Sequence, residues 1–146
     1  MKLRIAWIGK SKESAIQTLG SEYLKRISRY NQCEPSELST EAALLKSLEK
    51  VGRTAPVLVL MDSRGKQLSS EELAEFVRGH LERGTQELVF AIGPSDGWSE
   101  EALSRANAKL SMGKMTLPHE LARIVLLEQI YRAFTILNKH PYHGGH

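Results

Sequence analysis

Two short apolar runs decide the fold of this chain: Pro56-Val-Leu-Val-Leu-Met61 and Glu87-Leu-Val-Phe-Ala-Ile92. Both have the length of a strand and lack alternating polar residues, which is typical of strands buried on both faces of a parallel sheet. Such a sheet needs helices over each face. The two runs therefore predict an α/β fold with a mainly parallel sheet flanked by helices.

The segments before these runs continue the alternation of strands and helices. Lys2 to Ile8 predicts a strand, and apolar residues at helical spacing between 16 and 27 predict an amphipathic helix. Cys33 to Leu38 is ambiguous and is compatible with a short strand. A second helix is expected over residues 42–48, ending near Gly52.

The segments after the first run carry clear helix starts. Ser69 followed by Glu72 predicts a capping box, and the apolar face of that helix continues to Gly84. Ser99, followed by two glutamates, predicts the start of another helix. Leu110 to Met115 fits neither pattern and stays unassigned.

The last helix, expected over Leu121 to Leu137, is apolar around nearly its whole circumference. A helix of this kind is buried on more than one side. In a chain this small the core covers one side, so we expect a second subunit to cover the other and the protein to be a homodimer. Ile130 is expected to be one of the outward-facing apolar positions.

Length and composition indicate one ordinary globular domain over residues 1–146. The chain has 146 residues, 41% of them hydrophobic and 25% charged, with a formal net charge of +3. Its single cysteine, Cys33, cannot form an internal disulfide and is interpreted as a small buried hydrophobe. No secretion signal or membrane-spanning stretch is visible, so the expected location is the cytoplasm.

The basic residues concentrate at the N-terminus, where residues 1–30 carry seven bases against two acids. This asymmetry favours a surface for an anionic partner, of which nucleic acid is the commonest in the cytoplasm. The alternative is a solvated basic helix end, since Lys25, Arg26 and Arg29 would suit a helix C-terminus.

Three motifs are candidates for nucleotide, ligand or metal binding. Gly9-Lys10-Ser11 lacks the earlier glycine of a phosphate-binding loop, because that position is Arg4. The loop Gly93 to Gly97 follows a buried strand, so it is a pocket candidate as well as an ordinary turn. The C-terminal histidines, at 140, 143 and 146, lack supporting carboxylates or thiolates, so no metal site is predicted.

Three charges interrupt the apolar helix. Glu128 and Arg132 are spaced to pair at i,i+4, which leaves Arg123 or Arg132 to face a site.

The order of several motifs resembles the RlmH family of ribosomal RNA methyltransferases, which belong to the SPOUT class. The motifs are Ile92-Gly93 with Asp96-Gly97-x-Ser99, the run Leu110 to His119, the run Leu127 to Phe134, and the ending His140-Pro141-Tyr142-His143. Met1-Lys2-Leu3, Glu22 to Arg26 and Met61-Asp62-x-x-Gly65-Lys66 extend the resemblance over the whole chain.

The resemblance implies a SPOUT-like domain with a C-terminal deep trefoil knot, one of the rare exceptions to unknotted chains. It implies methylation of a pseudouridine at N3 in 23S-type large-subunit ribosomal RNA, with ribosomal particles as the expected substrate. The methyl donor that it implies is S-adenosylmethionine. The residues implied to bind this cofactor are Met61, Gly93, Met112, Gly113, Lys114, Met115, Thr116 and Leu117. Pro94 departs from the family's usual glycine, and proline supplies neither a positive φ nor an N–H donor.

Methylation at N3 requires removal of a proton and stabilisation of the negative charge that develops on the flanking carbonyls. We expect His143 to accept the N3 proton or to position the group that accepts it, and Arg132 to stabilise the charge. The residues expected to bind RNA are Lys10, Lys12, His119 and Tyr142. In a dimer, the tail of one subunit could close the site of the other. The alternative functions are a non-catalytic RNA-binding α/β module associated with the ribosome, and a nucleotide-binding protein that uses Gly9 to Ser11.

Overall fold

The structure is a computed structural model, and it describes residues 1–49 and 54–144, with residues 143 and 144 described in backbone alone. Its described strands form one sheet in the order β2-β1-β4-β3-β5, and every pairing is parallel. The strands are β1 (Lys2–Ile8), β2 (Cys33–Leu38), β3 (Val57–Gln67), β4 (Glu87–Ile92) and β5 (Ala108–Ser111). The predicted parallel α/β fold is confirmed.

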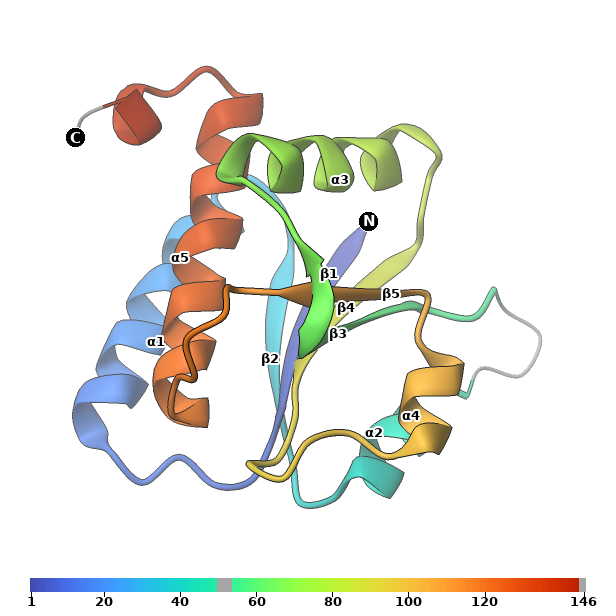
Figure 1. Cartoon of the computed structure of the whole chain (residues 1–146). Coiled ribbons are helices and arrows are strands. Elements are labelled where there is room, and N and C mark those ends of the chain that lie inside the picture. The colour runs from blue at the N-terminus through green and yellow to red at the C-terminus, as the bar shows by residue number, and fades with distance from the viewer. Residues whose placement is uncertain (50–53, 145–146) are drawn as a thin grey trace.

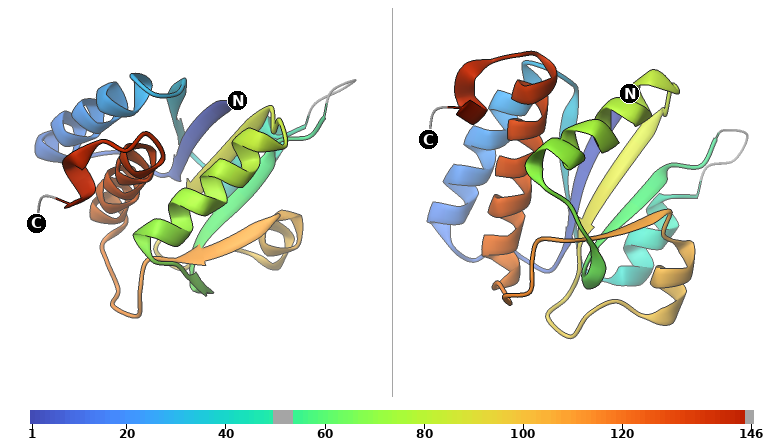
Figure 2. Two further views of the ribbon diagram at one scale, coloured as in Figure 1. Left: turned by 90° about the horizontal axis from the view of Figure 1, so that it is seen from above. Right: turned by 45° about the horizontal axis from the view of Figure 1, so that its top comes forward.

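Helices cover both faces of this sheet (Figures 1 and 2). One face carries α1 (Ser14–Ser28), α3 (Ser70–Glu82) and α5 (His119–Leu137), and the other carries α2 (Glu41–Ser47) and α4 (Glu100–Arg105). A short 3₁₀ turn, η1 (Pro141–Gly144), follows α5. Each face has its own buried core, and the side chains of β4 alternate between them: Phe90 faces α3 and α5, while Ala91 faces the other core.

The predicted helix starts are confirmed in detail. Ser69 caps α3, because its hydroxyl accepts from the Glu72 amide. In return, the Glu72 carboxylate accepts from the Ser69 amide at 2.8 Å. Ser99 caps α4. The second helix ends earlier than expected, at Ser47, and Gly52 lies outside the described residues. The unassigned segment from Leu110 is the end of β5 and the loop that leads to α5.

Packing of α5 explains why it is apolar around most of its circumference. It lies between α1 and α3 and against the sheet, so a single chain already covers three of its sides. The expectation for Ile130 was therefore wrong, because this side chain is fully buried in the core. The outer side of α5 presents Leu121, which is 43% exposed, together with the partly exposed Val125 and Ile136.

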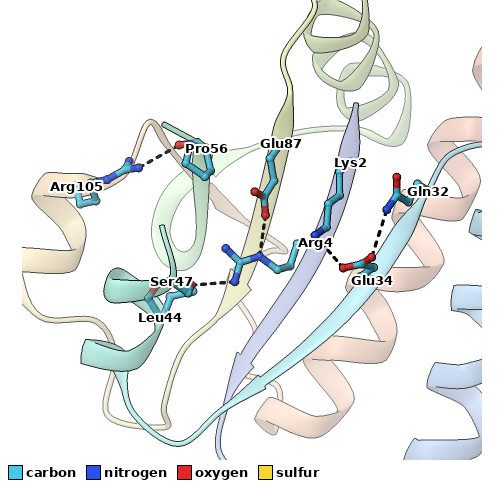
Figure 3. A network of polar contacts seen from close by, with 9 residues as sticks. All are labelled: Lys2, Arg4, Gln32, Glu34, Leu44, Ser47, Pro56, Glu87 and Arg105. Carbon is cyan, nitrogen blue, oxygen red and sulfur yellow. Dashed lines mark hydrogen bonds and ion pairs between the residues drawn. The ribbon is translucent and has the colours of Figure 1, made fainter. Parts of the chain in front are cut away.

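A buried ion pair joins β1 and β4 near the amino-terminal ends of the strands (Figure 3). Arg4 on β1 donates from Nε to Glu87 Oε2 at 3.0 Å and from Nη1 to Ser47 Oγ at 2.9 Å. The two charged side chains are only 10% and 12% exposed. The neighbouring ion pair between Lys2 and Glu34 has a similar length, 2.9 Å, but both of its side chains are exposed to solvent. Cys33, predicted to be a buried hydrophobe, is only partly buried, and this burial raises the pKa of its thiol to about 12.

Candidate functional site

A cavity of about 990 Å³ opens at the carboxyl ends of β3, β4 and β5. This is the edge at which open α/β sheets bind ligands. Its walls come from three segments, residues 61–64, 92–98 and 111–119, with Ala122 of α5 behind them. All eight residues predicted to bind the cofactor line it: Met61, Gly93, Met112, Gly113, Lys114, Met115, Thr116 and Leu117.

The loop after β4 is held against the sheet by an indole ring. Trp98 is buried, and its Nε1 donates to the Met61 carbonyl at 2.9 Å. A Cβ at Gly93 would lie 2.7 Å from this ring, so only glycine fits there. The carbonyl of Pro94 accepts from the Gly97 amide at 3.0 Å. Proline thus occupies a turn position at which its missing N–H is not needed.

The loop after β5 forms the opposite wall. Ser111 Oγ accepts from the Gly113 amide at 3.1 Å and donates to the Gly113 carbonyl at 3.0 Å. This small ring holds Gly113 at a φ of +123°, a conformation that side chains disfavour. Met115, next along this loop, is 87% exposed. The loop therefore presents backbone groups and apolar side chains to the cavity.

A bulge in β3 adds a charged rim that the sequence did not reveal. Met61 and Lys66 both lie opposite Leu110, so the residues between them leave the strand. Asp62, 7% exposed, accepts from the Arg64 amide at 2.8 Å and from its guanidinium at 3.1 Å. These bonds lower the pKa of Asp62. Asp62 directly follows the apolar run that ends at Met61, and no residue pattern indicated the irregularity in β3 that brings it to the cavity.

The two predicted RNA-binding lysines lie beside the cavity. Lys10 and Lys12 are exposed in the loop that follows β1, and the Lys12 amide donates to Glu120 Oε1 at 2.7 Å. The same loop passes His119, since a Cβ at Gly9 would lie 4.0 Å from His119 Nε2. His119 itself lines the cavity. The structure thus brings Lys10, Lys12 and His119 together at the cavity's edge.

The predicted catalytic residues lie at the other end of α5. Arg132 pairs with Glu128 at 2.8 Å, as the i,i+4 spacing predicted, and Tyr142 donates to the same carboxylate at 2.7 Å. The Arg132 guanidinium also lies 5.1 Å from the Tyr142 ring centre. Burial and the Glu128 carboxylate raise the pKa of Tyr142. Arg132 lies ten residues beyond Ala122, the last residue of α5 that lines the cavity, which is about 15 Å along the helix.

His143 lies in η1, but its side chain is outside the described part of the chain. Tyr142 therefore groups with Arg132, and not with the lysines that were assigned to the same RNA surface. Tyr131 packs edge-on against Tyr142 with ring centres 4.8 Å apart, and it had not been singled out from the sequence. Its place one residue before Arg132 was the only signal.

No group of three or more His, Cys, Asp or Glu side chains in the described ranges is placed to hold a metal ion. Within the same ranges, no helix has the length and apolar character needed to cross a membrane.

Known proteins resemble this chain in sequence over its whole length. The family described as predicted SPOUT methyltransferases matches residues 1–143. A "Ribosomal RNA large subunit methyltransferase H" from Koribacter versatilis is 68% identical over 146 residues and covers 100% of both chains. The protein of the same name from Trichlorobacter lovleyi is 47% identical over 152 residues, which covers 98% of this chain and 99% of the relative.

Two solved structures resemble it in fold. A probable methylase family protein from Haemophilus influenzae has a TM-score of 0.61 at 12% identity, over 96% of this chain and 69% of that one. The SpoU methyltransferase AviRb from Streptomyces viridochromogenes, solved in complex with AdoMet, has a TM-score of 0.51 at 13% identity. That match covers 89% of this chain and 56% of AviRb.

Proposed function

Because this chain belongs to the SPOUT methyltransferases, among the ribosomal RNA large subunit methyltransferases H, we propose that it methylates N3 of a pseudouridine in 23S-type large-subunit ribosomal RNA. S-adenosylmethionine is the methyl donor, residues 1–146 act as one SPOUT-like domain, and the enzyme works in the cytoplasm on ribosomal particles. The observation that carries this proposal is the cavity at the carboxyl ends of the strands, with an exposed basic loop beside it. The trefoil knot belongs to the same proposal, and the parallel strand order is consistent with it.

The residues around the cavity suit this cofactor. Its volume, about 990 Å³, is at the upper end of ligand pockets, which span roughly 300–1,000 Å³. Apolar Met61, Ile92 and Leu117 offer contacts for a purine ring, and the glycine-containing loops expose backbone donors and acceptors to it. Carboxylates and cations both reach the rim, as Asp62 and Lys114 show, which matches a zwitterionic amino-acid group.

When bound, S-adenosylmethionine supplies an electrophilic methyl group on its sulfonium. The chain's own residues must place the base, remove the N3 proton and stabilise the resulting negative charge. Arg132 is suited to the charge, because Glu128 holds its guanidinium in place and hydrogen bonding to that carboxylate raises the pKa of Arg132. We assign removal of the N3 proton to His143. The residues assigned to RNA binding are Lys10, Lys12, His119 and Tyr142.

Assembly of this machinery requires two subunits. Arg132 lies about 15 Å along α5 from Ala122, the last helix residue that lines the cavity, so a single chain does not join them. A two-fold axis that packs two α5 helices antiparallel places the tail of each subunit at the cavity of the other. The exposed side of α5, with Leu121, Val125 and Ile136, supplies an apolar surface for this contact. We therefore propose a homodimer with two composite sites.

The test combines binding with product analysis. Titration calorimetry measures S-adenosylmethionine binding, and mass mapping locates the methyl group in ribosomal RNA from a deletion strain that carries this chain. The proposal expects cofactor binding and one restored methyl group on a pseudouridine. Binding of ribosomal RNA without cofactor binding would instead support the non-catalytic RNA-binding module, and methylation of another nucleotide would refute the substrate assignment.

Removal of the tail tests the catalytic assignment. A chain without residues 141–146 should keep its fold, its dimer and its affinity for S-adenosylmethionine. Methyl transfer in a single turnover should fall about 10²-fold or more, which is the scale of losing an acid–base group. His143→Ala and Arg132→Ala are the single-residue comparisons. A truncated chain that works at the full rate would show that the tail has no catalytic role.

A further inference from the structure

Arg123 is a buried cation near the start of α5. It is the fifth residue of α5 and only 4% exposed. The N-terminal end of a helix carries partial positive charge, which disfavours a cation there. Within the described residues it forms no ion pair. Burial lowers its pKa, and the nearby charges of Glu120 and Glu37 offset this only in part. A charge kept under these conditions needs a compensating structural or functional reason.

The contacts of Arg123 lead to the basic loop after β1. Its Nη1 donates to Ser11 Oγ at 2.6 Å, and its guanidinium lies 4.0 Å from the centre of the Trp7 ring. Glu37 on β2 completes the arrangement, because its Oε1 accepts from the Ser11 amide and from Trp7 Nε1, both at 3.2 Å. Ser11 is therefore held by two hydrogen bonds: its hydroxyl accepts from Arg123, and its amide donates to Glu37.

The hydrogen bond from Arg123 fixes the loop to the N-terminal end of α5, which also lines the cavity. Ser11 stands between the two exposed lysines, Lys10 and Lys12. The Lys12 amide is bound by Glu120, and Gly9 passes His119, which lines the cavity. The placement of both lysines relative to the cavity thus depends on contacts with the first two turns of α5.

The space beneath the loop is not filled by apolar packing. A cavity of about 220 Å³ lies there, lined among others by Trp7, Ser11, Glu37 and Arg123. Polar contacts therefore hold the loop where packed side chains would hold it in an ordinary core. Without the guanidinium, the loop has room to move toward α1.

We propose that Arg123 is a positioning residue for RNA binding: it holds the loop of residues 9–12 so that Lys10 and Lys12 bind RNA phosphates at a fixed place beside the cofactor cavity. This inference rests on the proposed function. Arg123 acts through Ser11 and does not itself touch RNA or cofactor.

The test is steady-state methylation of ribosomal particles by the full-length dimer carrying Arg123→Gln. KM for the particles should rise roughly 10-fold or more, the effect of losing a hydrogen bond to a charged group that holds the binding surface. The kcat and the calorimetric affinity for S-adenosylmethionine should stay within about twofold. Arg123→Lys, which keeps a donor for Ser11, should recover part of the loss in KM.

Salt dependence gives a readout that loss of stability does not imitate. Each lost phosphate contact should reduce the slope of log KM against log salt concentration by about 0.7. We expect Arg123→Gln to reduce this slope as Lys10→Ala with Lys12→Ala does, and the triple variant to add nothing further. Arg78→Gln on α3 is the matched control, because it removes one positive charge from an exposed side chain.

The outcomes separate the inference from the proposed function. A normal KM for the double lysine variant would show that this loop does not bind RNA, which refutes that part of the proposed function. A raised KM for the lysine variant with a normal KM for Arg123→Gln would overturn the inference alone. Equal losses in KM, kcat and cofactor affinity for Arg123→Gln would show a general structural role and would also overturn it.

Discussion

Two inactive variants of this chain should restore activity when they share a dimer. Arg132→Ala removes the cation at the C-terminal end of α5, and Gly113→Val strains the cavity loop at a φ of +123°. Gly113 lies in the loop before α5, and Arg132 lies thirteen residues beyond the first residue of that helix. In the proposed antiparallel dimer, each active site takes one of these parts from each subunit.

The expected recovery follows from the geometry of a two-fold dimer. Random mixing of equal amounts gives half heterodimers, and each heterodimer contains one site with both defects and one site with neither. Activity should therefore return to about a quarter of the wild-type value. The variants would be co-expressed with different tags or refolded together, and methyl transfer to ribosomal particles would be measured in a single turnover.

A matched control fixes the meaning of this recovery. Arg132→Ala mixed with His143→Ala carries both defects in the same proposed half-site, so every heterodimer retains one defect in each site and no recovery is expected. If Arg132→Ala with Gly113→Val also stays at the sum of the separate activities while heterodimers are present, the composite site is wrong. Arg132 would then have no role at the partner's cavity.

Three further predictions concern the cofactor loop, the buried ion pair and a buried histidine. Gly113→Val should weaken S-adenosylmethionine binding in calorimetry, whereas Lys10→Ala should leave it unchanged and reduce RNA affinity in a salt-dependent way. Arg4→Met should lower the free energy of unfolding by about 3 kcal/mol in urea, because it strands a buried carboxylate, whereas Lys2→Met at the exposed pair should change it far less. Burial lowers the pKa of His80, so the unfolded chain binds a proton more readily; stability should fall as the pH drops below about 6.5, and His80→Phe should flatten that pH profile.

The sequence was sufficient to predict the layers of the fold but not the order of the strands. Apolar runs over β3 and β4 predict burial on both faces, and the alternation of Phe90 and Ala91 between two cores confirms this. Hydrophobicity does not say which strands are neighbours, so the place of β4 between β1 and β3 had no signal. The short β5 escaped for a related reason, since four residues are too few for a periodic pattern.

The error at Ile130 has a physical cause. An amphipathic helix reveals its outer side by its polar stripe, and α5 has almost none because α1, α3 and the sheet all contact it. Without that stripe, the side of the helix left uncovered depends on the places of the neighbouring helices. The charged rim escaped as well, because Asp62 reaches the cavity through an irregularity in β3 that no residue pattern announces.

The length of α5 relates the two halves of the proposed site. Its nineteen residues span about 28 Å, with His119 and Arg123 at one end and Arg132 near the other. The first end holds the basic loop and the wall of the cofactor cavity, and the second holds a guanidinium already oriented by Glu128. The Arg132 and Glu128 side chains are 18% and 20% exposed. The guanidinium is therefore accessible to a partner subunit and yet largely shielded from water. An oriented cation in a largely dry setting stabilises developing negative charge far better than one free in solvent. In the proposed dimer, antiparallel pairing of this helix brings the cation and the tail of one subunit to the basic loop and the cavity of the other.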